Sequence, residues 1–284
     1  MTLNANPETL SNTEFEKLSK FIHEQSGIKI SPVKKNMVEA RLRKRLKLLN
    51  LNSYSEYCDF LFSDFGKGTE VTQMVDVITT NKTDFFREPK QFDFLTDLAL
   101  PELLKYNSAG TKRPLKVWSA GCSTGEEPYT ISIVIHEYSL NQNYYSFNIL
   151  ATDISTRVLE KAKLAIYEEE RIDPVPEELI KKYFLRSKDR QKQLVRVVPE
   201  IRNKVNFQRL NLMDFDFRTN EKFDIIFCRN VIIYFDKKTQ DELIAKLINY
   251  LNPGGYLFLG HSESIFNSKL PLIQMQASTY RKIK

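Results

Sequence analysis

Two adjacent acids beside a glycine loop are the residues of this chain best placed to do chemistry. Glu126 and Glu127 follow a β-prone run and a loop with Gly121 and Gly125, and a proline then opens an apolar-periodic helix. A strand, a tight glycine loop and a helix in this order bring the backbone close to a nucleotide-like ligand. The two carboxylates would repel a pyrophosphate, which binds the free amides at helix starts. The motif therefore predicts a cationic ligand with a ribose, S-adenosylmethionine. A dinucleotide fits less well, because the G-x-G-x-x-G spacing is also absent.

Three further polar clusters follow predicted strands, at the edge where an open α/β sheet binds its ligands. Asp153 ends an apolar strand, where its carboxylate can accept two hydroxyl hydrogen bonds from a ribose; a role in capping the next helix is the alternative. Asn211 and its neighbours up to Asp214 can read an adenine edge. Residues 228–235 stand where methyltransferases place substrate-handling groups. They lack the sequences typical of amino- and cytosine C5-methylation of nucleic acid, which makes those reactions less favoured.

A polar and aromatic loop at residues 81–89 precedes the strands. Its two phenylalanines can anchor it to the core, while Asn81, Thr83 and Arg87 face a ligand. The forked donors of Arg87 suit the carboxylate of a methionine moiety. A structural ion pair is the alternative role for this arginine.

The elements that must position these residues are strands alternating with helices. Strands are predicted at residues 115–118, 147–152, 205–210, 223–228 and 255–260, and helices at 129–139, 155–165 and 237–251. This alternation predicts an α/β domain with a mostly parallel sheet wrapped by helices. Residues 168–203 are too long for a simple connection, and we expect a small inserted subdomain there.

The first 80 residues predict helices only. A capping box at Ser11 opens the first helix, and Ser31 and a proline open the second. A second capping box at Ser53 opens a helix that runs to about residue 65. Gly66 and Gly68 are expected to separate it from a further helix at 71–79. A helix at 91–105 and a linker at 107–114 follow. The predicted domains are therefore residues 1–80, a connecting region at 81–114, and residues 115–284.

Composition narrows the class of protein. Hydrophobic residues make up 42% and charged residues 27% of the 284 positions, as in soluble globular proteins. No stretch is apolar enough to span a membrane, and the polar N-terminus does not resemble a signal peptide. Three cysteines and three histidines are scattered without ligand spacing, so no metal site is predicted and a cytoplasmic location is expected.

The net charge of +6 is concentrated in one run, with eight basic residues and one acid at positions 28–47. An apolar stripe that includes Leu42 and Leu46 occupies one side of the predicted helix, so its cations are expected to face water: Lys34, Arg41, Lys44 and Arg45. Such a run is either a solvated helix face or a docking surface for an acidic partner.

Four of these segments together resemble the chemotaxis receptor glutamate methyltransferases, the CheR family. The matching strings are residues 80–88, 118–129, 227–236 and 260–263, in the family's order. The resemblance implies an all-α N-terminal domain on a Rossmann-like S-adenosylmethionine-dependent methyltransferase domain with an inserted β subdomain. It also implies that Arg87 and Tyr234 lie nearest the transferring methyl. Implied cofactor contacts come from Asn81, Thr83, Arg87, Gly121, Glu127, Asp153, Asn211, Leu212, Arg229 and Asn230. Of the two adjacent acids we favour Glu127 over Glu126.

The function that the resemblance implies is methyl transfer from S-adenosylmethionine to glutamates of chemotaxis receptors for sensory adaptation, with S-adenosylhomocysteine as product and no metal. The basic helix would dock the acidic receptor helices through Lys34, Lys35, Arg41, Lys44 and Arg45. The enzyme would be a monomer in the cytoplasm, recruited to receptor arrays, without nucleic acid or membrane insertion. Residues 187–193 lack the glycine with which many members bind a receptor pentapeptide, so the sequence leaves open whether that peptide is bound. The rivals are a methyltransferase for RNA or small molecules and a non-catalytic cofactor sensor.

Overall fold

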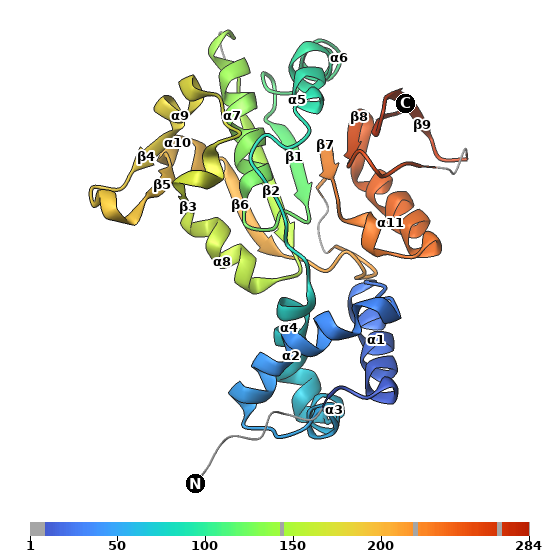
Figure 1. Cartoon of the computed structure of the whole chain (residues 1–284). Coiled ribbons are helices and arrows are strands. Elements are labelled where there is room, and N and C mark those ends of the chain that lie inside the picture. Colours follow the sequence, from blue (N-terminus) through green and yellow to red (C-terminus); the bar gives the residue numbers. More distant parts are fainter. Residues whose placement is uncertain (1–8, 143–144, 218–220, 266–268, 284) are drawn as a thin grey trace.

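The computed structural model describes residues 9–142, 145–217, 221–265 and 269–283. Figure 1 shows a helical N-terminal part and an α/β domain, joined by the segment that follows the fourth helix. In the described part of the chain, no helix is long and apolar enough to cross a membrane.

The N-terminal part contains α1 (Asn12–Ser26), α2 (Lys35–Leu49), α3 (Tyr54–Phe62) and α4 (Asp64–Ile78). The capping box predicted at the start of α1 is confirmed. Ser11 Oγ accepts a hydrogen bond from the Glu14 amide at 3.2 Å, and Glu14 Oε2 accepts one from the Ser11 amide at 2.8 Å. In the predicted stripe of α2, Val38, Leu42 and Leu46 are fully buried in a core shared by the four helices, whereas the last residue, Leu49, is partly buried.

The helix starts predicted at Ser31 and Ser53 are only partly right. One 3-10 turn (Pro32–Lys34) precedes α2, and Ser31 makes no side-chain capping bond. Ser53 Oγ accepts from the amide of Glu56 at 3.2 Å, but the Glu56 carboxylate accepts from the preceding residue, Asn52, at 2.8 Å. The second capping box is therefore incomplete.

The two glycines predicted to separate helices lie inside α4, so that prediction is wrong. The helices are divided earlier, at Ser63, whose Oγ accepts a hydrogen bond from the Gly66 amide at 3.0 Å. A Cβ atom on Gly66 would lie 1.9 Å from the carbonyl oxygen of Phe60. Gly66 is therefore required by the close approach of α3, and it does not mark a loop.

The α/β domain is built on a seven-stranded sheet with the order β6-β2-β1-β7-β8-β10-β9. The first five strands in this order run parallel: β6 (Val205–Arg209), β2 (Phe147–Asp153), β1 (Leu115–Ala120), β7 (Phe223–Cys228) and β8 (Leu251–Leu259). These confirm the five predicted strands. The antiparallel hairpin of β9 (Leu272–Gln276) and β10 (Thr279–Lys282) is not predicted from the sequence.

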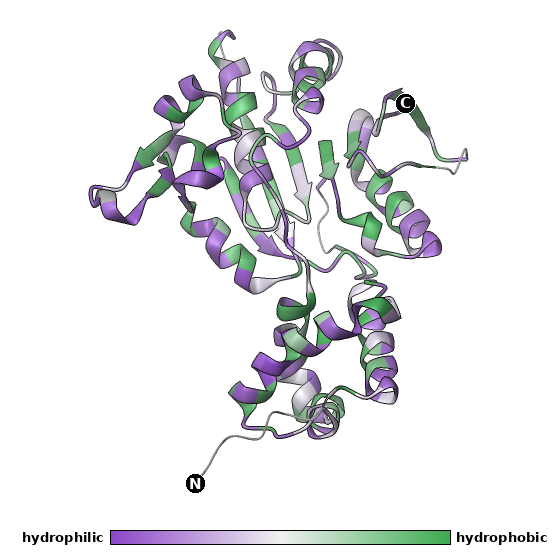
Figure 2. Ribbon diagram, in the orientation of Figure 1, coloured by the Kyte–Doolittle hydropathy of each residue, from purple (hydrophilic) through white to green (hydrophobic). Residues whose placement is uncertain are grey.

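Helices cover both faces of this sheet, which gives it the predicted Rossmann-like architecture. Trp118 of β1 packs with apolar residues of α11 (Lys237–Tyr250), whereas its neighbour Val117 packs with α7 (Glu126–Leu140) and α6 (Leu100–Asn107) on the other face. A π-helical stretch joins α6 to α5 (Lys90–Phe94), which confirms the helix predicted at 91–105. In Figure 2, β7 is mainly hydrophobic, while hydrophobic and hydrophilic residues alternate along the outer helix α8.

A second, smaller sheet follows α8 (Thr156–Leu164). Its three antiparallel strands have the order β3-β5-β4, with bounds β3 (Ile166–Glu168), β4 (Phe184–Arg186) and β5 (Leu194–Val197). The helix α9 (Glu177–Tyr183) precedes β4. Figure 1 shows these elements on one side of the main sheet, as a subdomain inserted between α8 and β6.

Candidate active site

One cavity collects every residue predicted to contact a cofactor. Its lining includes Asn81, Thr83, Arg87, Gly121, Glu127, Asp153, Asn211, Leu212, Arg229 and Asn230, together with Tyr234. The loops after β1, β2 and β7 meet there because β1 lies between β2 and β7 and all three strands run parallel. The opposite wall comes from the N-terminal part, with Ile28, Lys29, Lys34 and Met37. The cavity therefore lies between the two parts of the chain.

The glycine loop after β1 needs its glycines. Gly121 has φ +83° and Gly125 has φ +97°, a region in which side chains are strained. A Cβ atom on Gly121 would also lie 2.4 Å from Cγ2 of Val231, in the loop after β7. The loop can therefore approach its neighbour only because this position carries no side chain.

Asp153 joins the loops after β1 and β2. Its Oδ2 accepts a hydrogen bond from the Ser123 amide and its Oδ1 one from the Ser155 amide, both at 2.9 Å. Burial raises the pKa of Asp153, against the lowering effect of these amides. The capping role considered for Asp153 belongs to Ser155, whose side chain accepts from the Val158 amide in the first turn of α8.

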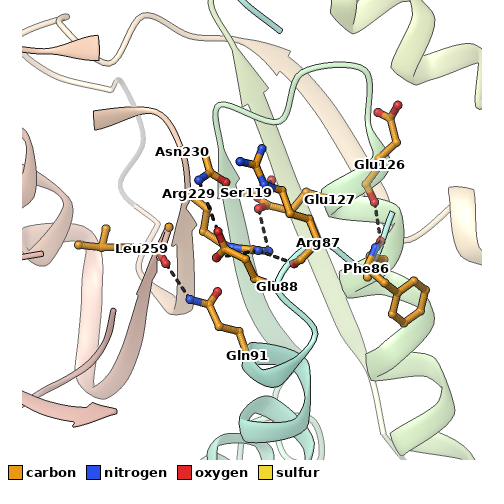
Figure 3. A network of polar contacts seen from close by, with 12 residues as sticks. Phe86, Arg87, Glu88, Gln91, Ser119, Glu126, Glu127, Arg229, Asn230 and Leu259 are labelled. Atoms are coloured by element: carbon orange, nitrogen blue, oxygen red, sulfur yellow. Dashed lines mark hydrogen bonds and ion pairs between the residues drawn. The ribbon is translucent and has the colours of Figure 1, made fainter. Parts of the chain in front are cut away.

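Arg229 lies between two carboxylates (Figure 3). Its guanidinium is 3.1 Å from Oε2 of Glu88 and 3.3 Å from Oε2 of Glu127, and it also donates to the carbonyl of Arg87. Burial raises the pKa of Glu127, although Arg229 and the hydroxyl of Ser119 act to lower it. At Glu88, burial is outweighed by Arg229 and the amide of His261, which hold its pKa below the ordinary value.

The two adjacent acids of α7 have different surroundings. Glu127 lines the cavity and accepts a hydrogen bond from Ser119 Oγ at 2.7 Å. Glu126 is not part of the lining; it is buried against Arg171, 2.8 Å away. This geometry favours Glu127 as the acid that contacts a cofactor.

The loop after β7 is organised by a residue that sequence reasoning left without a role, Glu263. Its Oε2 accepts hydrogen bonds from the amides of Gly260 at 2.6 Å and Asn230 at 2.9 Å, and its Oε1 accepts one from the Ile233 amide at 3.1 Å. Burial raises the pKa of Glu263, while these amides act to lower it. Asn230, in the left-handed region at φ +58°, and Tyr234 are thereby held at the cavity.

Arg87 and Tyr234 both face the cavity. Within the described part of the chain Arg87 forms no ion pair, so the alternative role of a structural ion pair finds no support there. Its guanidinium donates a hydrogen bond to the Lys82 carbonyl at 3.4 Å. The Nζ atom of Lys34 lies 5.9 Å from the ring centre of Tyr234, and the amide of Lys29 donates to the Tyr234 carbonyl at 2.8 Å. The N-terminal part therefore contacts this tyrosine directly.

The basic residues of α2 and of the 3-10 turn before it differ in exposure and in their intramolecular partners. Lys34 and Lys44 are exposed, and Lys35 donates to the side chain of Asn12. Arg41 donates to the carbonyls at the end of α4. Arg45 makes two hydrogen bonds to Glu70, at 2.8 and 2.6 Å, and its side chain is only 14% exposed. The expectation that Arg45 faces water is wrong, because a buried acid on α4 pairs with it.

The cavity's donor and acceptor set suits S-adenosylmethionine. The carboxylates of Glu127 in the first turn of α7 and of Asp153 at the end of β2 line it, where they can bind a ribose and a cation, and Arg87 can bind the methionine carboxylate. No group of residues able to hold a metal ion occurs in the described segments. The fold and the cavity thus define a Rossmann-like methyltransferase that uses S-adenosylmethionine.

Comparison with known proteins gives the family. Residues 81–281 match the model described as CheR methyltransferase, SAM binding domain, and residues 13–79 match CheR methyltransferase, all-alpha domain. The chain belongs to the CheR methyltransferase family. It is 41% identical to the chemotaxis protein methyltransferase of Borreliella burgdorferi, over 96% of this chain and 95% of that protein. It is 39% identical to chemotaxis protein methyltransferase 2 of Pseudomonas aeruginosa, over 90% and 88%.

Among solved structures, the glycopeptide N-methyltransferase MtfA complexed with sinefungin is similar over 73% of this chain and 62% of that chain, with 14% identity and a TM-score of 0.35. The family membership establishes the protein as an S-adenosylmethionine-dependent methyltransferase of chemotaxis.

Proposed function

We propose that this enzyme transfers a methyl group from S-adenosylmethionine to glutamate side chains of chemotaxis receptors, forming methyl esters for sensory adaptation. The observation that carries the proposal is the composition of the cavity. One wall has the carboxylates and Arg87 suited to the cofactor, and the other has Lys29 and Lys34, which suit an acidic acceptor. The names of the relatives support a substrate within chemotaxis.

The proposed chemistry needs little from the protein beyond alignment. S-adenosylmethionine supplies an electrophilic methyl group on a sulfonium. A glutamate with a pKa of about 4.3 is already ionised at neutral pH, so no strong base is required. Because charge is lost on both reactants, a strongly charge-solvating site would favour the ground state over the transition state. Holding two reactants in line can contribute about 7–11 kcal/mol in principle.

We assign this alignment to Arg87 and Tyr234. Arg87 has no acid to hold it among the described residues, so its guanidinium is available to the methionine carboxylate. Tyr234 is fixed from both sides, through its carbonyl by Lys29 and through its loop by Glu263. Its hydroxyl is therefore suited to orient the acceptor.

Receptor docking is assigned to the basic face of α2 and the 3-10 turn before it, with Lys34 and Lys44 as its exposed cations and Lys35 beside them, hydrogen-bonded to the side chain of Asn12. Arg41 and Arg45 belong to the same helix but already serve intramolecular partners. The division into residues 1–80, 81–114 and 115–284, the cytoplasmic location with recruitment to receptor arrays and the monomeric state are part of the proposal.

The test is transfer of radiolabelled methyl from S-adenosylmethionine to membranes that contain the organism's chemoreceptors. Label that base releases as methanol, and that Arg87→Ala abolishes, is the expected result. Arg196→Ala, an exposed arginine of the inserted sheet, is the matched control and should keep wild-type labelling. Cofactor binding without receptor label would contradict the proposed substrate and favour a sensor or an RNA enzyme. Failure to bind the cofactor would contradict the site.

A further inference from the structure

One arginine of the inserted subdomain reaches the loop that borders the cofactor cavity. Arg171 lies in a short 3-10 turn (Glu169–Ile172) directly after β3. Its guanidinium donates to Asp84 Oδ1 at 3.2 Å, to Glu126 Oε1 at 2.8 Å and to the carbonyl of Thr83. A single side chain thereby joins the subdomain, the 81–89 loop and the first turn of α7.

An apolar contact joins the same segments independently. Phe85, in the middle of the loop, is fully buried in the core of the inserted subdomain. Its ring lies 5.0 Å from that of Tyr167 on β3 and 5.4 Å from that of Phe184 on β4. The hydroxyl of Tyr167 also donates to the carbonyl of Thr124 in the glycine loop, at 2.8 Å. The inserted subdomain therefore contacts both loops that lead into the cavity.

The loop has few other polar contacts near Thr83. Ser123 Oγ donates to the Asn81 carbonyl at 2.9 Å on one side, and the Phe86 amide donates to Thr130 Oγ1 at 3.1 Å on the other. Between these two points, Arg87 donates to the Lys82 carbonyl from within the loop, and among the described residues Arg171 supplies the hydrogen bonds from outside it. The backbone at Thr83 therefore depends on Arg171 for its position.

Charge strengthens this arrangement. The side chain of Glu126 is 2% exposed, and that of Arg171 is 37% exposed. A carboxylate this deeply buried is costly without a partner, so the pair fixes the guanidinium against α7. Neither residue is part of the lining of the cavity.

We propose that Arg171 is a positioning residue for the methyl donor. It acts through Thr83 and the 81–89 loop, and it sets the affinity for the cofactor more than the rate of transfer. The inserted subdomain thereby forms part of the cofactor site. This inference rests on the proposed contacts of Thr83 and Arg87, and not on the identity of the methyl acceptor.

The experiment is calorimetric titration of S-adenosylhomocysteine into the full chain, with thermal unfolding of each variant measured alongside. Arg171→Ala should raise Kd roughly 5- to 30-fold, the loss expected when about 1–2 kcal/mol of charged hydrogen bonding to a loop is removed. Arg171→Lys keeps the charge but loses the planar guanidinium with its forked donors, and it should bind more tightly than Arg171→Ala but less tightly than wild type. Arg196→Ala is the control, with Kd within about twofold of wild type as the expected result.

A double variant separates positioning from stability. Arg171→Ala leaves Glu126 buried without its cation, so Glu126→Gln should restore part of the lost thermal stability. It cannot restore the hydrogen bond to Thr83, and the double variant should still bind S-adenosylhomocysteine weakly. Recovery of affinity together with stability, or a Kd of Arg171→Ala within twofold of wild type, would overturn the proposal. Wild-type binding without receptor labelling would contradict the proposed function and leave this inference intact.

Discussion

Replacing Arg229 by methionine tests the energetics on which the site depends. The Arg229 side chain is 2% exposed and is the shared cation of Glu88 and Glu127, whose side chains are 11% and 13% exposed. It also donates to the carbonyl of Arg87 and lies 5.5 Å from the ring centre of Phe92. Methionine keeps an unbranched side chain but removes the charge, the cation–π contact with Phe92 and every donor.

Arg229→Met should lower the free energy of unfolding strongly, because both carboxylates lose the cation that they share. Removing one side of a buried ion pair costs about 3–5 kcal/mol, most of it from the charge left unpaired. Without Arg229, burial would raise the pKa of Glu88 and raise that of Glu127 further. A carboxyl whose folded-state pKa is raised favours folding as the pH falls through that pKa. The destabilisation should therefore be about 3–5 kcal/mol near pH 7.5 and about 1–2 kcal/mol smaller near pH 5.

The assay is denaturant unfolding of wild type, Arg229→Met and Arg229→Met with Glu127→Gln at both pH values. The double variant leaves one unpaired charge in place of two, and should recover about 1–3 kcal/mol. Arg186→Met is the control, because the Arg186 side chain is 70% exposed and lies 3.6 Å from Glu169. It should cost less than about 1 kcal/mol. A cost below 1 kcal/mol for Arg229→Met, or further loss in the double variant, would refute the reasoning.

Three other predictions follow from the contacts around the cavity. Tyr234→Phe should lower kcat more than it weakens S-adenosylhomocysteine binding, since only the orienting hydroxyl is lost; equal losses in kinetics and calorimetry would contradict this assignment. The amide of Thr239 and the side chain of His23 lower the pKa of Asp236 from its ordinary 3.8 to about 2, so its stabilising effect should be present above about pH 4 and be lost as the pH falls through 2. Asp236→Asn should cost at most about 1 kcal/mol at pH 6, because the pair is partly exposed, and progressively less as the pH falls through about 2; unfolding curves with a pH-independent difference would disprove this. Glu263→Gln should cost about 1–3 kcal/mol in unfolding free energy, since its NH2 group would face a backbone donor, and should reduce kcat as well; an unchanged kcat would show that the loop is held without Glu263.

The parts of the fold that the sequence predicts are those in which local pattern and tertiary packing agree. The apolar run at 223–228 matches β7 to the residue, since both faces of a central strand are buried. The hairpin of β9 and β10 is missed because both strands are short, β9 is partly exposed at the sheet edge, and neither strand has a clear period. Gly66 misleads because glycine favours a loop locally, whereas here it permits helix contact.

The same distinction applies to the site. Residues that follow strands, such as Asp153 and Asn230, are predictable because the carboxyl ends of parallel strands share one edge. The residues that hydrogen-bond to them or hold their loops are not predictable in this way. Arg171 lies 45 positions from Glu126, and Glu263 lies 33 positions from Asn230. Neither stands in a motif with a recognisable mechanism. The sequence shows only an isolated acid or arginine after a strand, which does not identify the residue that it contacts.

The contacts between the two parts of the chain explain why the family pairs an all-α domain with the methyltransferase domain. The side chain of Asp76, at the end of α4, accepts hydrogen bonds from the amide and hydroxyl of Thr156 at the start of α8. His23 of α1 lies 2.7 Å from Asp236, which caps α11. The Asp76 contact supplies an acceptor to an amide at a helix start, where the first amides lack intrahelical partners. The carbonyl of Gln25 in α1 accepts a hydrogen bond from the side chain of the cavity residue Asn211 at 2.7 Å. The helical part therefore contacts the loops of the site, and in the proposed function it also carries the exposed cations that would dock the acceptor. Alignment, the main demand of the proposed chemistry, is thus supplied jointly by both parts.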